Sequence, residues 1–191
     1  MNKTQMLEAR ARSIAWAKHM TSMTGAVYLD TETTGLGDDA AICDIAVVAA
    51  DGSVLFDTLI NPAIPIPDQA TNVHGITDLM VAGAPIWPEV AERLIDLIED
   101  RPVCIYNARY DVPLINRLNV DHGIPEIHAD WQCAMLAFGE FDGTPNRFGD
   151  GFKWHKLEHA VRSFGLEPGG HRALADTQAT RQLVAAMANV H

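Results

Sequence analysis

Hydrophobic residues follow two different periods along the chain, and their alternation predicts a mixed α/β fold. Residues 4–20 contain no proline or glycine, and their apolar residues recur at helical spacing, which predicts an amphipathic helix. The apolar face of this helix is expected to carry Leu7, Ala11, Ile14 and Ala17. Three short apolar segments with the composition of strands follow at 25–30, 41–50 and 53–60. Asp51-Gly52 joins the last two segments and is a strong hairpin signal.

The second half of the chain begins with a proline-rich stretch and then alternates helical and strand-like segments. Residues 61–88 contain five prolines, which fix the backbone and remove hydrogen-bond donors, so we expect loops with short helical turns there. Glycine, proline and asparagine mark a further loop at 140–151. The other expected elements are a helix at 89–99, a strand at 103–107, a helix at 111–119, a weak strand near Ile127, and helices at 131–138, 154–164 and 173–190.

The order of these elements predicts the architecture. A meander of three strands followed by alternating helices and strands indicates one mixed sheet with helices on its faces. The length of 191 residues suits a single domain. We therefore expect one domain at 25–191, preceded by an N-terminal helical extension at 1–24.

Composition narrows the classes of function. The chain is 48% hydrophobic and 20% charged, as is usual for globular proteins. Its net charge of −11 disfavours a long basic surface for duplex nucleic acid, although carboxylates that bind cations would contribute to this value. Three isolated cysteines predict reduced thiols rather than disulfides. With no signal-peptide core and no apolar run of about 18 residues, we expect a soluble, cytoplasmic protein without membrane contacts.

Carboxylates stand at the ends of two predicted strands. Asp30 and Glu32 are two residues apart at the end of the first strand, so their side chains point to the same side. Asp111 follows the strand at 103–107, whose end is expected beside the end of the first strand. Taken alone, the first pair is typical of a solvated turn and Asp111 of a helix N-cap.

A glycine-rich loop leads into the last predicted helix and carries two further candidates, His171 and Asp176. Gly169-Gly170 gives the loop the freedom to bring the His171 ring over a bound molecule. Taken alone, Asp176 is typical of an acid near a helix N-terminus, and a single histidine is more often structural than catalytic. The basic residues near these segments are each typical of ordinary surface charges; they are Arg109, Arg147, Lys153, Lys156 and Arg172.

The combination of these acids is more specific than any one of them. Several carboxylates that converge from separate elements repel one another and cost stability. Such a group makes physical sense around hard cations such as Mg²⁺ or Mn²⁺, which prefer oxygen ligands. Two such ions would stabilise the attacking and the leaving oxygen in phosphodiester cleavage, and a histidine suits the role of general base near neutral pH.

Together these segments resemble the motifs of the DEDDh (DnaQ-like) superfamily of 3′–5′ exonucleases, which includes the proofreading epsilon subunit of bacterial replicative DNA polymerase. The third motif resembles the histidine form, because the tyrosine form would place Tyr where Arg172 stands. The resemblance extends from Val27 to the C-terminus. The matching segments are, in chain order, 28–36, 74–78, 84–85, 107–111 and 171–176.

The resemblance implies an RNase H-like fold, a mixed five-stranded sheet flanked by helices, and two Mg²⁺ ions for which Mn²⁺ would substitute. It assigns His171 as the general base. The implied metal ligands are Asp30, Glu32, Asp111 and Asp176. The implied contacts to the terminal nucleotide and its pocket are Thr31, Thr33, Leu36, His74, Ile76 and Asn107. For His74 a structural role is a strong alternative, because a histidine in a proline-rich segment often braces the loop.

The sequence departs from the family pattern at three positions. Tyr106 stands where many relatives carry His, Tyr110 where Phe is usual, and Trp131 where Thr is expected. The last departure bears on the start of the helix at 131–138. None of the three falls on a predicted catalytic residue.

Hydrolysis from the 3′ end is implied by the resemblance rather than by the acids themselves. The primary prediction is an exonuclease that acts on mainly single-stranded DNA and releases nucleoside 5′-monophosphates. Two alternatives are an exoribonuclease that trims RNA 3′ ends, and a proofreading subunit that docks on a DNA polymerase. The N-terminal helix is a candidate for the docking element, although packing on its own domain is the preferred expectation for it. A homodimer is also compatible with the family. A non-catalytic binding module is disfavoured, because such a module should lack one or more metal ligands.

Overall fold

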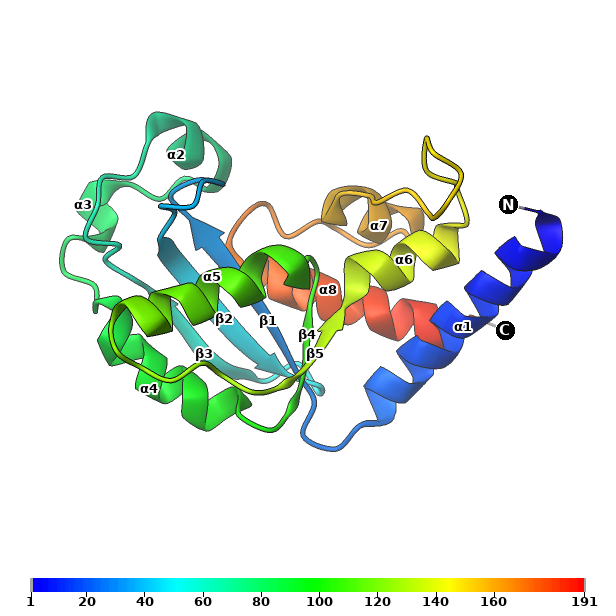
Figure 1. The fold of residues 1–191 in the computed structure, drawn as a ribbon, viewed down its shortest axis with the longest axis horizontal. Coiled ribbons are helices and arrows are strands. Elements are labelled where there is room, and N and C mark those ends of the chain that lie inside the picture. The colour runs from blue at the N-terminus through cyan, green and yellow to red at the C-terminus, as the bar shows by residue number, and fades with distance from the viewer. Residues whose placement is uncertain (1, 191) are drawn as a thin grey trace.

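The protein folds around one five-stranded sheet in the computed structural model, which describes residues 2–190. Figure 1 shows the sheet between two layers of helices. The strands are β1 (Val27–Thr33), β2 (Ile42–Ala49), β3 (Val54–Leu59), β4 (Pro102–Ile105) and β5 (Asp130–Cys133). The helices are α1 (Lys3–Ser22), α2 (Asp68–His74), α3 (Asp78–Val81), α4 (Trp87–Ile98), α5 (Ala108–Asp121), α6 (Ala134–Asp142), α7 (Leu157–Ser163) and α8 (Ala173–Ala188).

The sheet has the order β3-β2-β1-β4-β5 and mixes both strand orientations. β1, β2 and β3 are antiparallel neighbours, whereas β4 and β5 run parallel to β1. The hairpin between β2 and β3 turns at Gly52, whose φ of +94° favours glycine. The predicted meander and the predicted mixed five-stranded sheet are therefore confirmed.

The two faces of β1 are covered by different helices. Val27 and Leu29 pack with α4 and α5 in one core, whereas Ala26 and Tyr28 pack with α1, α6, α7 and α8 in another. This arrangement follows from the two-residue period of a strand buried on both sides. Asp30 and Glu32 continue the alternation of Tyr28, so their side chains project on the α8 side. The hydrophobic pattern of β1 thus decides which helix the acids face.

The N-terminal helix is confirmed as α1, and its buried face includes the predicted Ala17 but not Leu7. Leu7 is 61% exposed, and α1 packs on α6 and α8 through Ala9, Ser13, Ala17 and Met20. The Ser13 hydroxyl donates a hydrogen bond to the carbonyl oxygen of Ala137 in α6. Most of the buried residues on this face are small, which lets α1 approach α6 and α8 closely. Within residues 2–190, no helix combines the length and the apolar character that crossing a membrane requires.

Two predicted boundaries in the second half are wrong by about one helical turn. Residues 130–133, including Trp131, form β5 rather than helix, and α6 begins at Ala134. The backbone of this segment pairs with β4 along its whole length, and that pairing outweighs the local helical pattern. Helix α7 begins at Leu157 rather than at 154, and the segment before it stays extended.

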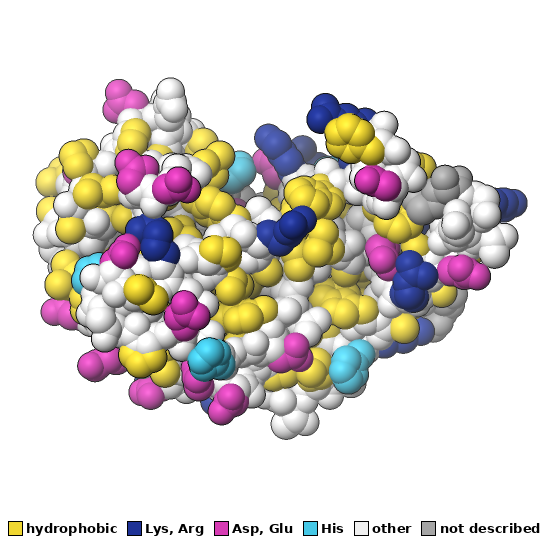
Figure 2. Space-filling model, viewed as in Figure 1, with side chains coloured by type: hydrophobic (Ala, Val, Ile, Leu, Met, Phe, Trp, Pro, Cys, Tyr) yellow, Lys and Arg dark blue, Asp and Glu magenta, His cyan; other side chains and the backbone are white. Residues whose placement is uncertain are grey.

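The proline-rich stretch forms loops with the short helices α2 and α3, as predicted. Acidic side chains are spread over the face shown in Figure 2, in agreement with the net charge of −11. Several Lys and Arg side chains lie instead around a hollow near the upper centre of this view. The acidic composition therefore does not exclude a local basic surface.

Candidate active site

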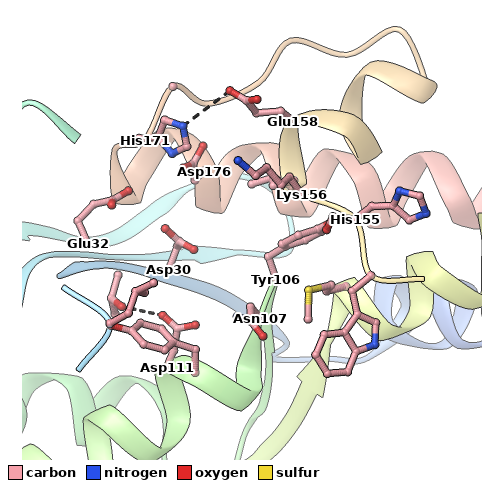
Figure 3. Close-up of a pocket in the computed structure, with 17 residues that line it drawn as sticks. Asp30, Glu32, Tyr106, Asn107, Asp111, His155, Lys156, Glu158, His171 and Asp176 are labelled. Atoms are coloured by element: carbon pink, nitrogen blue, oxygen red, sulfur yellow. Dashed lines mark hydrogen bonds and ion pairs between the residues drawn. The ribbon is translucent and has the colours of Figure 1, made fainter. Parts of the chain in front are cut away.

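Three carboxylates meet at the end of β1. Asp30 and Glu32 project from the face of the sheet that α8 covers, and Asp176 lies in the first turn of α8 (Figure 3). One carboxylate oxygen from each residue lies within 4.8 Å of the others. The fold thus joins acids from the first and the last elements of the domain into one cluster.

Asp111 approaches the same cluster from α5. Its side chain is buried in the first turn of α5, and the Thr31 hydroxyl donates a hydrogen bond of 2.6 Å to its Oδ1. Burial raises the pKa of Asp111 to about 6, although the hydrogen bond from Thr31 lowers it. Thr31 therefore positions a carboxylate, and the nucleotide contact that the resemblance implies for it stays a prediction.

Burial and charge repulsion act most strongly on Asp30 and Glu32, the two acids of β1. Burial raises the pKa of Asp30 well above the usual range, and neighbouring carboxylates raise it further. These neighbours are, in order of effect, Asp111, Glu32, Asp176 and Asp44. Burial likewise raises the pKa of Glu32 to about 8, with further contributions from Asp176 and Asp44. In the metal-free protein the cluster would therefore hold protons at neutral pH.

Divalent cations would relieve this repulsion. The converging groups are carboxylates, which supply the oxygen ligands that Mg²⁺ and Mn²⁺ prefer. Positive charge at the centre of the cluster would keep all four acids ionised. The residues at the end of β1 therefore fit the binding of divalent metal.

A fifth acid, Asp44, was missed by the motif analysis. It lies opposite Glu32 in the register of β1 and β2, and its side chain is buried. Its Oδ2 accepts a hydrogen bond of 2.9 Å from Arg172 Nε, whereas its Oδ1 has no hydrogen-bond partner among the described residues. Arg172 is thus held beside the cluster rather than free on the surface. An aspartate inside the apolar run 41–50 was the available signal.

The loop before α8 holds His171 in the cavity wall. A Cβ at Gly169 would lie 2.1 Å from Asp176 Oδ1, so only glycine allows the loop to pass this close to the cluster. His171 has a φ of +59° and its side chain is about half exposed. Its Nε2 lies 3.7 Å from Glu158 Oε1 (Figure 3). Gly169 thus allows the close approach of this loop to the cluster.

All five predicted catalytic residues line one cavity of about 540 Å³. Thr31, Leu36 and Asn107 line it as well. Leu36 is 87% exposed, so an apolar side chain stands at the rim with no protein group covering it. This placement suits the predicted contact between Leu36 and a base.

The other three predicted pocket residues, Thr33, His74 and Ile76, do not line this cavity. Ile76 is 0% exposed and packs in a small core with Cys43, Ile66 and Val81. His74 Nδ1 accepts a hydrogen bond of 3.0 Å from the Ile76 amide, and its Nε2 lies 3.3 Å from the Thr33 carbonyl oxygen. Burial lowers the pKa of His74, which favours the neutral ring that these contacts need. The structure thus places His74 as a brace between two loops and Ile76 in a core.

The segment 154–158 forms a wall of the cavity that the sequence analysis did not identify. Trp154, His155, Lys156, Leu157 and Glu158 all line the cavity, with Tyr106, Tyr110 and Met135 nearby. The Tyr106 hydroxyl donates a hydrogen bond of 2.8 Å to the His155 carbonyl oxygen, which fixes the extended backbone before α7. Of the five basic candidates, only Lys156 lines this cavity.

The chain shows clear similarity to known proteins. Residues 27–184 match a protein-family model named RNase_T and described as Exonuclease. The chain belongs to this exonuclease family. The exonuclease is 40% identical over 170 residues to Uncharacterized exonuclease CP81 of Escherichia phage 186, covering 85% of this chain and 87% of that protein. It is 34% identical over 169 residues to a DNA polymerase III subunit epsilon-like protein of Rhodobacter capsulatus, covering 82% of this chain but 22% of that protein.

A solved structure supports the same assignment. The exonuclease aligns with Exonuclease X in complex with 5′ overhanging duplex DNA at a TM-score of 0.60 and 27% identity. The alignment covers 85% of this chain and 90% of that chain. These similarities confirm the DEDDh (DnaQ-like) family, the RNase H-like fold and the class of enzyme, a 3′–5′ exonuclease.

The raised pKa values predict an unusual pH dependence of stability in EDTA. Glu32 has a pKa of about 8 in the folded state against 4.5 for an unperturbed side chain, so the folded state binds more protons between these values. The free energy of unfolding should therefore fall as the pH rises through this interval, by an amount on the order of a few kcal/mol. Urea unfolding at a series of pH values measures this slope. Glu32→Gln should reduce it, whereas Glu126→Gln, at an exposed position, should not; an unchanged slope in Glu32→Gln contradicts the assignment.

Proposed function

We propose that the exonuclease removes nucleotides one at a time from the 3′ end of mainly single-stranded DNA and releases nucleoside 5′-monophosphates. The observation that carries this proposal is the convergence of Asp30, Glu32 and Asp176 in a cavity that also holds Asp111 and His171. Carboxylates and a histidine in one cavity are what metal-assisted hydrolysis of a phosphodiester requires.

The carboxylates would hold two Mg²⁺ ions, with Mn²⁺ able to substitute. Asp30 lies between the other acids and would be shared, while Glu32, Asp176 and Asp111 would complete the ligands. When bound, the ions would stabilise the attacking and the leaving oxygen of the phosphodiester. Thr31 would hold Asp111 in place through its hydrogen bond, and Arg172 would balance the charge of Asp44, which lies beside Glu32.

His171 would act as the general base. Its ring stands on a loop at the cavity wall, where it would accept a proton from the attacking water. The neighbouring Glu158 carboxylate would stabilise the imidazolium that this transfer produces. Leu36, at the rim, would pack against the terminal base.

The strand behind the terminal nucleotide would pass over an aromatic and basic surface next to the catalytic cavity. A second cavity of about 790 Å³ shares Trp154 with the first and is also lined by Arg147, Phe148 and Lys153. Phe148 is 72% exposed, and the Arg147 guanidinium lies 4.5 Å from its ring centroid. Exposed aromatic rings beside cations are the usual platform for unpaired bases. This surface is the reason for preferring a single-stranded substrate.

A second candidate function is proofreading in association with a DNA polymerase. The similarity to an epsilon-like protein of polymerase III favours it. Helix α1 packs on α6 and α8 of its own chain, so a polymerase would have to bind the outer side of α1, where Leu7 is exposed. A polymerase that co-purifies with the wild type and is lost with Leu7→Asp would favour this candidate.

A time course on a 5′-labelled single-stranded DNA oligonucleotide and its RNA counterpart tests the proposal. With Mg²⁺, the DNA should shorten by single nucleotides, and EDTA should stop the reaction. Asp176→Asn should lower the rate by at least about a hundredfold, because even indirect changes at metal sites cost up to that much. The fold should persist, since the substitution relieves repulsion. Asp96→Asn, at an exposed position on α4, is the matched control. Faster cleavage of RNA would reassign the substrate, and internal cuts would contradict an exonuclease.

The role of His171 predicts a pH profile. The rate with Mg²⁺ should rise with pH through the range in which histidine side chains lose a proton, near about 6.5 in model peptides. His171→Ala should lower the rate by about a hundredfold or more and flatten this rise. His128→Ala, at an exposed position far from the cavity, should leave the profile unchanged. A wild-type profile in His171→Ala would exclude this histidine as the base.

If the strand lies on the aromatic and basic surface around Phe148, a substitution there should weaken binding of the strand without changing the chemical step. Phe148→Ala should raise the KM for an oligonucleotide about tenfold, because stacking contributes roughly 1–3 kcal/mol per base. The p-nitrophenyl ester of thymidine 5′-monophosphate has no further nucleotides, so its hydrolysis should not change. Leu79→Ala, which removes an exposed apolar side chain on α3, should affect neither substrate. An equal loss of activity on both substrates in Phe148→Ala would contradict binding of the strand to this surface.

A further inference from the structure

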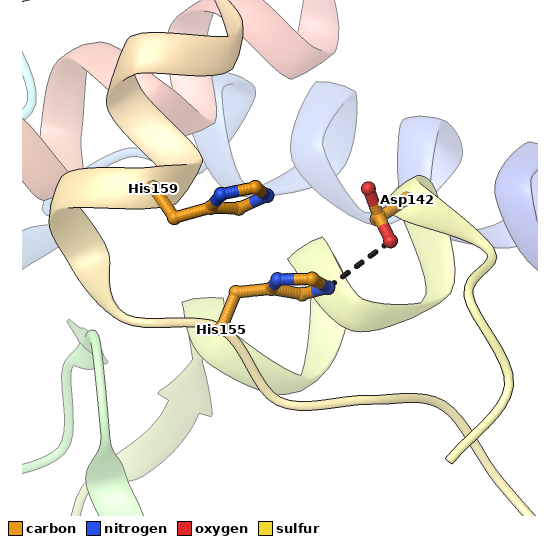
Figure 4. A group of neighbouring side chains, drawn as sticks. All are labelled: Asp142, His155 and His159. Atoms are coloured by element: carbon orange, nitrogen blue, oxygen red, sulfur yellow. Dashed lines mark hydrogen bonds and ion pairs between the residues drawn. The ribbon is translucent and has the colours of Figure 1, made fainter.

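A second group of side chains that could hold a metal ion lies outside the catalytic cluster, where the end of α6, the following loop and α7 meet. Asp142 ends α6, His155 lies in the extended segment before α7, and His159 lies in the first turns of α7 (Figure 4). One ligand atom from each of the three residues lies within 4.8 Å of the others. None of them is among the motif residues of the family.

The two imidazole rings lie side by side, next to the Asp142 carboxylate. They stack at 4.4 Å between centroids and 14° between planes, and both direct a ring nitrogen towards the Asp142 carboxylate (Figure 4). His155 Nε2 lies 3.0 Å from Asp142 Oδ2. The His159 ring has no hydrogen-bond partner in the part of the chain that the structure describes. His159 therefore has a ring nitrogen free to bind a cation beside Asp142 and His155.

Packing holds this arrangement in place. The His155 side chain is 7% exposed, and its ring meets the Phe138 ring edge to face at 5.5 Å. The His159 ring meets the same Phe138 ring at 6.2 Å. The Thr144 amide donates a hydrogen bond to Asp142 Oδ2, which orients the carboxylate. These contacts hold the carboxylate and both rings next to one another, so that rotation of the rings would bring the three ligand atoms to one ion.

We propose that Asp142, His155 and His159 form a zinc site distinct from the catalytic cluster. Two imidazole nitrogens and one carboxylate oxygen suit Zn²⁺, which commonly takes three protein ligands and a water in tetrahedral geometry. The spacing His-x₃-His is also frequent among zinc ligands. The catalytic cluster differs in kind, because its three closest groups are all carboxylates, the ligands of harder cations.

The ion would fix one wall of the catalytic cavity. His155 lies between Trp154 and Lys156, which line that cavity, and its carbonyl oxygen accepts the hydrogen bond from Tyr106. Binding of Zn²⁺ would tie this segment to the end of α6 and the start of α7. The residues of the site would thus act as positioning residues, and the site itself does not depend on which reaction the exonuclease catalyses.

Zinc binding is tested on the double variant Asp30→Asn/Asp176→Asn, so that the catalytic cluster does not compete for the ion. Isothermal titration with ZnCl₂, in excess Mg²⁺, should give one Zn²⁺ per chain. Saturating Zn²⁺ should raise the Tm by roughly 5–10 °C when its free concentration exceeds the Kd about a hundredfold. Adding His159→Ala should weaken binding at least tenfold and reduce the shift in Tm by about half or more at the same Zn²⁺ concentration. Adding His128→Ala, an exposed histidine elsewhere, should change neither.

Co²⁺ provides a readout of the ligand geometry. Co²⁺ replaces Zn²⁺ in many proteins, and its visible absorption is intense only when the ion has four ligands. The double variant should show this spectrum, and Asp142→Asn or His159→Ala should abolish it while the circular dichroism stays unchanged. Absence of Zn²⁺ binding, or equal binding after His159→Ala, would overturn the proposal. Because the catalytic ligands are already replaced, neither result bears on the proposed nuclease activity.

Discussion

Mutual repulsion among buried carboxylates is the constraint on which the rest of this structure depends. Asp30, Glu32, Asp111 and Asp176 approach one another at the end of β1. Burial raises the pKa of Asp30, Glu32 and Asp111, and neighbouring carboxylates raise the pKa of Asp30 and Glu32 further. A fold that only had to be stable would separate them. Their convergence indicates a site shaped for divalent cations, and the scaffold around it is arranged to keep the acids in place. In this respect the protein gives up stability for function, as active sites generally do.

The scaffold delivers the acids by simple means. The two-residue period of β1 sends Asp30 and Glu32 towards α8, while Thr31, on the opposite face, holds Asp111. Gly169 lets the loop before α8 pass against Asp176, and Arg172 on the same loop neutralises Asp44 behind Glu32. On the other side, the hydrogen bond from Tyr106 to the His155 carbonyl oxygen secures the wall that carries Glu158, the neighbour of His171. Each of these contacts involves only a few residues, and together they join segments that are far apart in the chain.

Much of this arrangement could be predicted from the sequence, because local patterns determine it. The meander, the strand carrying Asp30 and the helix carrying Asp176 follow from hydrophobic periods, and the motif spacing indicated which acids converge. Features set by tertiary packing could not be predicted. Pairing with β4 makes the segment around Trp131 a strand despite its helical pattern. In α1, the contacts with α6 and α8 bury small residues such as Ala9 and Ser13, whereas Leu7 stays exposed. Motif matching placed Ile76 at the nucleotide, whereas the structure buries it, since apolar character alone does not distinguish a pocket from a core.

The most direct test of the account is to locate metal ions at the end of β1. Crystals grown with MnCl₂ and a nucleoside 5′-monophosphate would show Mn²⁺ through its anomalous scattering. The account predicts two peaks in the catalytic cavity, both in contact with Asp30, with Glu32 and Asp176 among the other ligands and the phosphate between the ions. Crystals that contain the nucleotide in the cavity but no Mn²⁺ at these carboxylates would contradict it.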